Sequence, residues 1–262
     1  SKVLKKWGLS AEEVSKLLVG KHRRRYLGEL LHSEVDVDQI DYLLRDSHYT
    51  GVALGMVDAD RLIRTLCISK DRLCILGKGV EAVEGVLTAR GLMYSSVYYH
   101  HTVRTAEVMM TNAVDWALEY DCGGKLQNIF LMNDAQLIET LWEMGGYAAE
   151  MVSRIEYRQL FKNAYIEPRR DLTKAEKRRY LREFGRWSCV KETQEEIADE
   201  AGVDAGKVLL DVPVVDIITS EPRIQKVEMP VLMDGKLCKL TDVSPIAEAL
   251  KRRQAPRYLV RV

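Results

Sequence analysis

The 262-residue chain is long enough to bury a hydrophobic core, either as one large domain or as a main domain with a smaller one. Its 39 basic and 39 acidic side chains cancel, so no net field attracts nucleic acid or an anionic membrane over the whole surface. A content of 47% hydrophobic and 30% charged residues excludes an intrinsically disordered protein.

Membrane and secretory signals are missing from the sequence. No apolar run reaches the ~18 residues that a membrane span needs, and the opening SKVLKKWGLS lacks the apolar segment of a signal peptide. The five cysteines form no CxxC pair and are odd in number, which favours reduced thiols over a disulfide framework or a structural zinc site. We therefore expect a cytoplasmic protein without a membrane partner.

Helix signals dominate the first 165 residues. Ser10 and Asp36 are each followed three residues later by Glu or Gln, which predicts a helix start at both positions, and the second helix is expected to end near Gly51. Short β-rich runs flank residues 69–72, which predicts a hairpin. Apolar residues at helical spacing then predict one long helix over residues 80–120 and further helices over 134–145 and about 148–165.

After Pro168 the pattern becomes mixed. Thr173 and Thr193 each open a capping-box pattern, Asp234-Gly235 separates two apolar β runs, and Pro245 suits the first turn of a last helix. Residues 207–215 and 257–262 also read as strands. The predicted fold class is therefore mainly α with a small β-hairpin in residues 1–165, followed by a smaller α+β region in residues 166–262.

The segment DVDQIDYLLRDSHYTG places charge and an aromatic ring on one helix face. At about 100° per residue, Asp38, Tyr42 and Asp46 share a face with Asp41 and Arg45, while an apolar stripe points the other way. The face is either a solvated surface with an i,i+4 ion pair, or the lining of a cleft that offers carboxylates and a ring to a ligand. The stripe consists of Ile40, Leu43 and Leu44.

This segment resembles the one that carries the last metal ligand in the HD superfamily of phosphohydrolases, in particular the deoxynucleoside triphosphate triphosphohydrolases. The stretches SSVYYHHT and RIEYRQLFKNAY follow in similar order and spacing, so the resemblance covers residues 25–165 and implies an HD-domain-like helical block. It implies that Asp38 is a metal ligand, that Tyr42 packs against a deoxyribose, that Asp46 meets the sugar 3′-hydroxyl, and that Tyr98 lies at the sugar edge.

The sequence departs from that family in two respects. Gln39 stands where mammalian-type relatives have a lysine that contacts phosphates. The family's earlier histidine and His-Asp pair are missing from these 262 residues, and no His-Asp dipeptide occurs. Because His48 faces away from Asp46 and His100 and His101 diverge by about 100°, the five histidines are not expected to rebuild the metal site.

Two hypotheses remain. The first is the C-terminal part of a metal-dependent phosphohydrolase acting on a nucleotide, with a deoxynucleoside triphosphate as one candidate; its divalent ion (Mn, Mg, Zn, Ni or Fe) binds only if the missing ligands are supplied. The second is a non-catalytic nucleotide or nucleic-acid binding module, for which the basic segment Arg169–Trp187 is a candidate contact or else a solvated helix face. The resemblance also implies self-association into a homo-oligomer.

Overall fold

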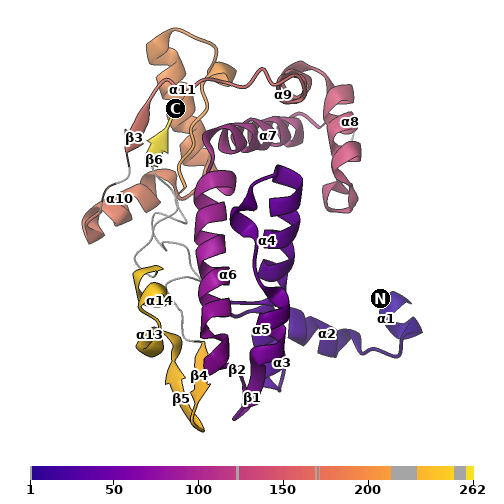
Figure 1. Cartoon of the computed structure of the whole chain (residues 1–262). Helices are drawn as coiled ribbons and strands as arrows, with labels where there is room; N and C mark the ends of the chain where they lie inside the picture. Colours follow the sequence, from indigo (N-terminus) through magenta and orange to yellow (C-terminus); the bar gives the residue numbers. More distant parts are fainter. Residues whose placement is uncertain (1, 122–123, 169, 171, 214–228, 251–257) are drawn as a thin grey trace. The chain divides into compact units, whose positions relative to one another are not determined.

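The computed structural model describes residues 2–121, 124–168, 170, 172–213, 229–250 and 258–262. The chain forms two compact units, one of residues 1–97 and 219–255 and the other of residues 98–218 and 256–262. Helices make up most of the described residues, which confirms the predicted mainly α class (Figure 1). The division expected at residue 165/166 stays a prediction; in space, residues 229–250 pack within the unit that contains the N-terminus.

The first unit consists of helices packed around a small mixed sheet. Its elements are α1 (Lys2–Lys6), α2 (Ala11–Leu18), α3 (Arg25–Leu31), α4 (Val37–Thr50), η1 (Ala53–Gly55), α5 (Ala59–Thr65), β1 (Leu66–Ser69), β2 (Arg72–Leu76), η2 (Gly77–Gly79), α6 (Val80–Met93), β4 (Pro230–Met233), β5 (Lys236–Lys239), α13 (Leu240–Val243) and α14 (Pro245–Leu250). Helices α4 and α6 run side by side (Figure 1).

The sheet has the order β1-β2-β4-β5 and confirms both predicted hairpins. Lys70 and Asp71 have φ of 50° and 59°, as a tight two-residue turn between antiparallel strands requires. Asp234 and Gly235 make the same kind of turn between β4 and β5. Strands β2 and β4 pair in parallel through Ile75 and Val231, and this pairing joins the two hairpins into one sheet.

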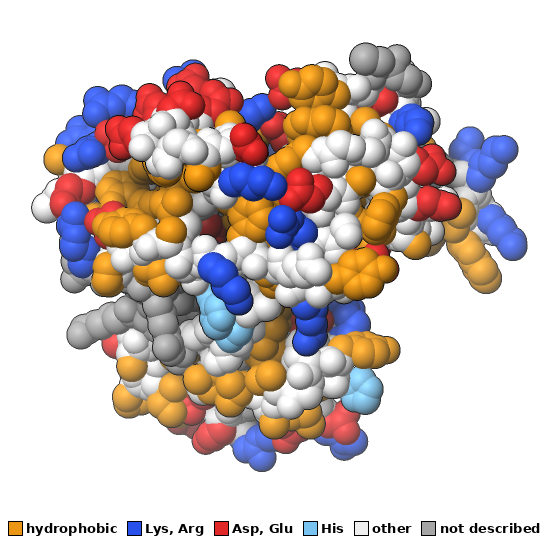
Figure 2. All heavy atoms as spheres, turned by 90° about the horizontal axis from the view of Figure 1, so that it is seen from above, with side chains coloured by type: hydrophobic (Ala, Val, Ile, Leu, Met, Phe, Trp, Pro, Cys, Tyr) orange, Lys and Arg blue, Asp and Glu red, His pale blue; other side chains and the backbone are white. Residues whose placement is uncertain are grey.

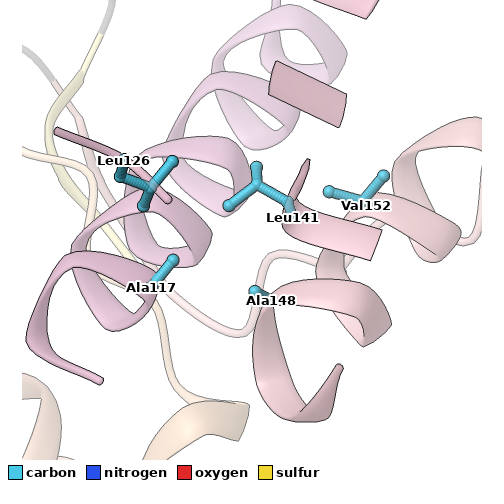
Figure 3. Close-up of a cluster of buried hydrophobic side chains, with 5 residues drawn as sticks. All are labelled: Ala117, Leu126, Leu141, Ala148 and Val152. Carbon is cyan, nitrogen blue, oxygen red and sulfur yellow. The ribbon is translucent and has the colours of Figure 1, made fainter. Parts of the chain in front are cut away.

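The second unit is a set of helices with a two-stranded sheet. Its elements are α7 (His101–Glu119), η4 (Ile129–Leu131), α8 (Asp134–Met144), α9 (Gly146–Glu156), β3 (Ile166–Pro168), α10 (Lys174–Phe184), α11 (Trp187–Ala201), η5 (Ala205–Lys207) and β6 (Tyr258–Arg261). Helices α7, α8 and α9 enclose a core whose buried members, drawn in Figure 3, are Ala117, Leu126, Leu141, Ala148 and Val152.

Two helix predictions were wrong in extent. The long helix expected over residues 80–120 is interrupted by the π-helical turn η3 (Tyr94–Tyr98), where the Ser95 hydroxyl donates to the carbonyl oxygen of Gly91 (3.0 Å). A new helix then begins at His101, capped by the side chain of His100, which accepts from the backbone N–H of Thr102 (3.3 Å). The helix expected over 148–165 ends at Glu156.

The capping box predicted at Thr193 is also wrong. Helix α11 already begins at Trp187, so Thr193 lies inside it and donates its hydroxyl to the carbonyl oxygen of Cys189 (2.9 Å). The box at Thr173 is confirmed, because its side chain and that of Glu176 each accept from the other's backbone N–H. Of the strand expected over residues 207–215, the described part forms a single bridge between Asp211 and Arg261, and residues 214–215 lie outside the described residues.

On the face drawn in Figure 2, acidic and basic side chains lie interspersed. None of the described helices combines the length and the apolar character that crossing a bilayer requires.

Candidate nucleotide site

Helix α4 is fixed at its N-terminus by a buried cap. Asp36, only 1% exposed, accepts from the backbone N–H of Gln39 (2.8 Å) and from its side-chain amide (3.1 Å). Gly51, in the left-handed conformation at φ 70°, ends the helix. The predicted boundaries of the aspartate-rich helix are therefore confirmed, and both of its ends are fixed by capping residues.

The buried face of α4 is partly polar. Leu43 is buried as predicted, but the most buried positions beside it are Gln39 and Ser47, whereas Ile40 and Leu44 are only half-buried. The amide nitrogen of Gln39 also donates to the backbone carbonyl of Ser33 (3.2 Å). Gln39 thus points beneath the helix and is engaged there, which excludes it from the role of the lysine that contacts phosphates in mammalian-type relatives.

The opposite face of α4 carries the three predicted site residues of this helix. Asp38 is exposed in the first turn and makes no hydrogen bond or ion pair with any described residue. Asp46 is half-buried, and its carboxylate lies 3.8 Å from Nε of Arg45. Arg45 also pairs with Asp41 one turn away, as the i,i+4 spacing predicts.

Tyr42 lies between these carboxylates and is half-buried. Burial raises the pKa of its hydroxyl far above the usual range, with a further upward contribution from Tyr94 and a downward one from Arg90. Tyr42 therefore stays neutral and offers an aromatic face; it does not act as a base.

Arg90, on α6, is the residue that sequence reasoning missed. It is 3% exposed, and its guanidinium carbon lies 5.4 Å from the centre of the Tyr94 ring. Its Nε and Nη1 atoms are buried and have no hydrogen-bond partner among the described residues. A buried guanidinium with two unused donors matches a carboxylate or phosphate oxygen, because arginine binds such groups bidentately.

A signal for Arg90 was present in the sequence. It stands in the apolar run VLTARGLM, at helical spacing from Val83, Val86 and Leu87, so it occupies the buried face of its helix. A charged residue in such a position is rarely fully buried unless something pairs with it. A helical wheel of residues 80–93 would therefore have singled it out.

Tyr98, the fourth predicted site residue, is half-buried and lies at the start of the second unit. Asp38, Tyr42, Asp46 and Arg90 belong to the first unit. The structure thus brings together the three residues of α4 and adds Arg90 beside Tyr42, whereas the role of Tyr98 stays a prediction.

The potential metal ligands among the described residues do not gather at one place. In the part of the chain that the structure describes, no three His, Cys, Asp or Glu side chains gather closely enough to hold an ion. His22 contacts the Glu13 carboxylate (3.0 Å), and His32 contacts the Leu18 carbonyl (2.7 Å). The described residues therefore do not make a complete metal centre, and the role of Asp38 as a metal ligand stays a prediction.

Comparison with known proteins places the chain in a family. Residues 57–259 match the family model described as the HD associated region. An uncharacterized protein of Methanocaldococcus jannaschii is 30% identical over 261 residues, covering 95% of this chain and 53% of that protein. The human deoxynucleoside triphosphate triphosphohydrolase SAMHD1 is 25% identical over 219 residues, covering 73% of this chain and 33% of that protein.

A solved structure has the same fold. A Bacteroides thetaiotaomicron phosphohydrolase superposes with a TM-score of 0.63 at 20% sequence identity, covering 99% of this chain and 69% of that one. The chain spans about half the length of the archaeal relative. The chain belongs to the HD-associated region family and is an HD-superfamily phosphohydrolase-like protein.

Proposed function

We propose that this chain forms the substrate-binding wall of a metal-dependent phosphohydrolase that acts on a nucleotide, with deoxynucleoside triphosphates as the leading candidates. The observation that carries the proposal is the buried guanidinium of Arg90, with two unused donors, beside Tyr42 and Tyr94. The similarity to the human deoxynucleoside triphosphate triphosphohydrolase SAMHD1 supports the choice of substrate.

Each residue has a role in this proposal. Arg90 donates to phosphate oxygens and so takes over the contact that Gln39 cannot make. The neutral ring of Tyr42 packs against the sugar, and the half-buried carboxylate of Asp46 accepts from a sugar hydroxyl.

Asp38 is proposed as one ligand of a divalent ion. Such an ion, when bound, supplies an activated water and neutralises charge on the phosphate. Because the described residues do not make a complete centre, the roles proposed for this chain are to supply one metal ligand and to bind and orient the substrate.

The proposal predicts that binding depends on phosphate. Calorimetric titration of the chain with a deoxynucleoside and with its mono- and triphosphate should show affinity that rises with phosphate, and Arg90→Met should remove the increment. A charge-assisted hydrogen bond contributes ~1.5–3 kcal/mol, so the loss should be about tenfold or more. Asp41→Asn, which removes a surface charge on the exposed side of α4, is the control and should leave binding unchanged. An increment that survives in Arg90→Met contradicts the proposal.

A second candidate function is nucleic-acid binding through α10. Lys174, Arg178 and Arg182 are exposed at i,i+4,i+8 and form no ion pair with any described residue. Tyr180 of the same helix does not offer its ring to a base, because it is buried and donates its hydroxyl to Glu167 (2.7 Å). Arg169 lies outside the described residues. Binding of single-stranded DNA that weakens steeply with salt, and weakens further in Arg178→Gln, would support this function; salt-independent binding would contradict it.

A further inference from the structure

A cavity of about 320 Å³ in the second unit is separate from every residue discussed above. It is lined by α7, α9, α11 and η5, and its walls combine aromatic rings with carboxylates. The rings are those of Trp116, Tyr120 and Tyr147, and the carboxylates are those of Asp115, Glu119 and Glu195.

The three rings form a connected wall. The centres of the Trp116 and Tyr120 rings lie 4.8 Å apart, and those of Trp116 and Tyr147 lie 6.3 Å apart. Glycines leave room for two of them. A Cβ atom at Gly146 would lie 2.9 Å from the Trp116 ring, and one at Gly206 would lie 2.7 Å from the Tyr147 ring. The backbone therefore has no side chain where these two rings need space.

The lining of the cavity also contains two buried side-chain amides. Gln194 and Asn112 are 5% and 8% exposed, and the Gln194 amide nitrogen donates to Oδ1 of Asn112 (3.2 Å). The Gln194 oxygen accepts from the backbone N–H of Leu210 (2.9 Å). These hydrogen bonds fix the orientation of both amides in the lining of the cavity.

The cavity carries a net negative charge, and its carboxylates already bind the ammonium group of one lysine. Nζ of Lys191 lies 3.0 Å from the Asp115 carboxylate and 2.9 Å from the Glu119 carboxylate. Glu195 makes no ion pair with any described residue. Three carboxylates against one ammonium leave a formal charge of −2 in the cavity, which repels phosphates and favours a cation.

We propose that this cavity is a binding site for an aliphatic polyamine. Aromatic faces attract organic cations, and carboxylates hold their ammonium groups. Lys191 shows the same chemistry within the chain, since its ammonium and methylene stem match one end of such a ligand. A polyamine places one ammonium beside Glu119 and Glu195 and lays its methylene groups along the rings of Trp116 and Tyr120.

The test is calorimetric titration of the full chain with spermidine at fixed ionic strength. Glu195→Gln removes one carboxylate that has no partner to lose, so folding is unaffected and spermidine should bind about threefold to fivefold more weakly. Lys191→Met removes the competing ammonium and should strengthen binding by a similar factor. Glu200→Gln, the same change at an exposed position of α11 outside the cavity, is the matched control and should have no effect.

Competition with Mg²⁺ distinguishes a polyamine site lined by aromatic rings from a surface that is only acidic. Mg²⁺ has no methylene groups that contact the rings, so it should displace spermidine poorly when the two are compared at equal concentrations of cationic charge. Tyr120→Ala removes one ring and should weaken spermidine binding. The proposal is overturned if spermidine does not bind, if Glu195→Gln binds it like Glu200→Gln, or if Mg²⁺ displaces it equally well. If Lys191→Met does not fold, the comparison of Glu195→Gln with Glu200→Gln decides the test. These outcomes are independent of the nucleotide site, which lies in the other unit.

Discussion

Replacing Arg90 by methionine should stabilise the folded chain, because the guanidinium is buried without the partners it needs. Its Nε and Nη1 atoms have no acceptor among the described residues, and the side chain is 3% exposed. A buried donor without a partner costs ~1–3 kcal/mol. Methionine has a similar length, adapts to irregular space and carries no donor.

The size of the effect follows from two opposing contributions. Relief of two unpaired donors amounts to roughly 2–6 kcal/mol, and loss of the contact with the Tyr94 ring removes about 0.5–2 kcal/mol. A gain in the free energy of unfolding of about 2 kcal/mol is therefore expected. At roughly 2–4 °C per kcal/mol for a chain of this size, the melting temperature should rise by about 4–8 °C.

Urea unfolding followed by circular dichroism measures the change, and Arg104→Met provides the contrast. Arg104 also has a half-buried guanidinium, but it donates to Asp211 at 2.6 Å and 3.3 Å. Its removal leaves a buried carboxylate with fewer partners and should cost about 3–5 kcal/mol. If Arg90→Met were instead destabilising by 1 kcal/mol or more, as a paired arginine would be, the assignment of Arg90 as an unpaired anion-binding group would be refuted.

Three further results are expected. Asp36→Ala removes the cap of α4 and leaves the Gln39 amide groups buried with fewer acceptors, so the free energy of unfolding should fall by about 2–3 kcal/mol in the same urea assay; a loss below ~0.5 kcal/mol would contradict the buried cap. Gly55→Ala places a Cβ 2.5 Å from the carbonyl oxygen of Leu43 on α4, so the free energy of unfolding should fall by about 1–3 kcal/mol. An unchanged melting temperature would contradict this close approach of η1 to α4. Hydrogen bonds lower the pKa of Glu176 to about 2, so its contribution to α10 is present above the ordinary carboxyl range and is lost as pH falls toward 2; acid titration by circular dichroism should lose this step in Glu176→Gln, and an unchanged acid transition would count against it.

Local signals predicted the local structure well. The Asp36 cap, the turn at Lys70 and Asp71 and the turn at Asp234 were predicted because each depends on a few neighbouring residues. The break at η3 and the early start of α11 were missed, because hydroxyl groups such as those of Ser95 and Thr193 bond to the backbone in ways that a periodic pattern does not reveal.

Non-local features were beyond the sequence pattern. The parallel pairing of Ile75 with Val231 joins segments more than 150 residues apart, and alternation within each strand does not identify its neighbour. Arg90 was overlooked although its helical spacing from Val83, Val86 and Leu87 placed it on the buried face of its helix. The spacing did not reveal that its Nε and Nη1 atoms lack a hydrogen-bond partner among the described residues.

The central claim, that α4 presents a ligand and a substrate wall to a hydrolytic centre, is tested most directly by comparing two neighbouring aspartates. In the protein encoded by the complete reading frame that contains this sequence, hydrolysis of deoxynucleoside triphosphates is measured with Mn²⁺ or Mg²⁺ for Asp38→Ala and Asp41→Ala. Both side chains are exposed on α4, but Asp41 pairs with Arg45 whereas Asp38 has no partner among the described residues. Loss of turnover in Asp38→Ala with near-normal turnover in Asp41→Ala is the predicted result. Equal turnover in the two variants, or turnover in Asp38→Ala like that of the unaltered protein, would contradict the account.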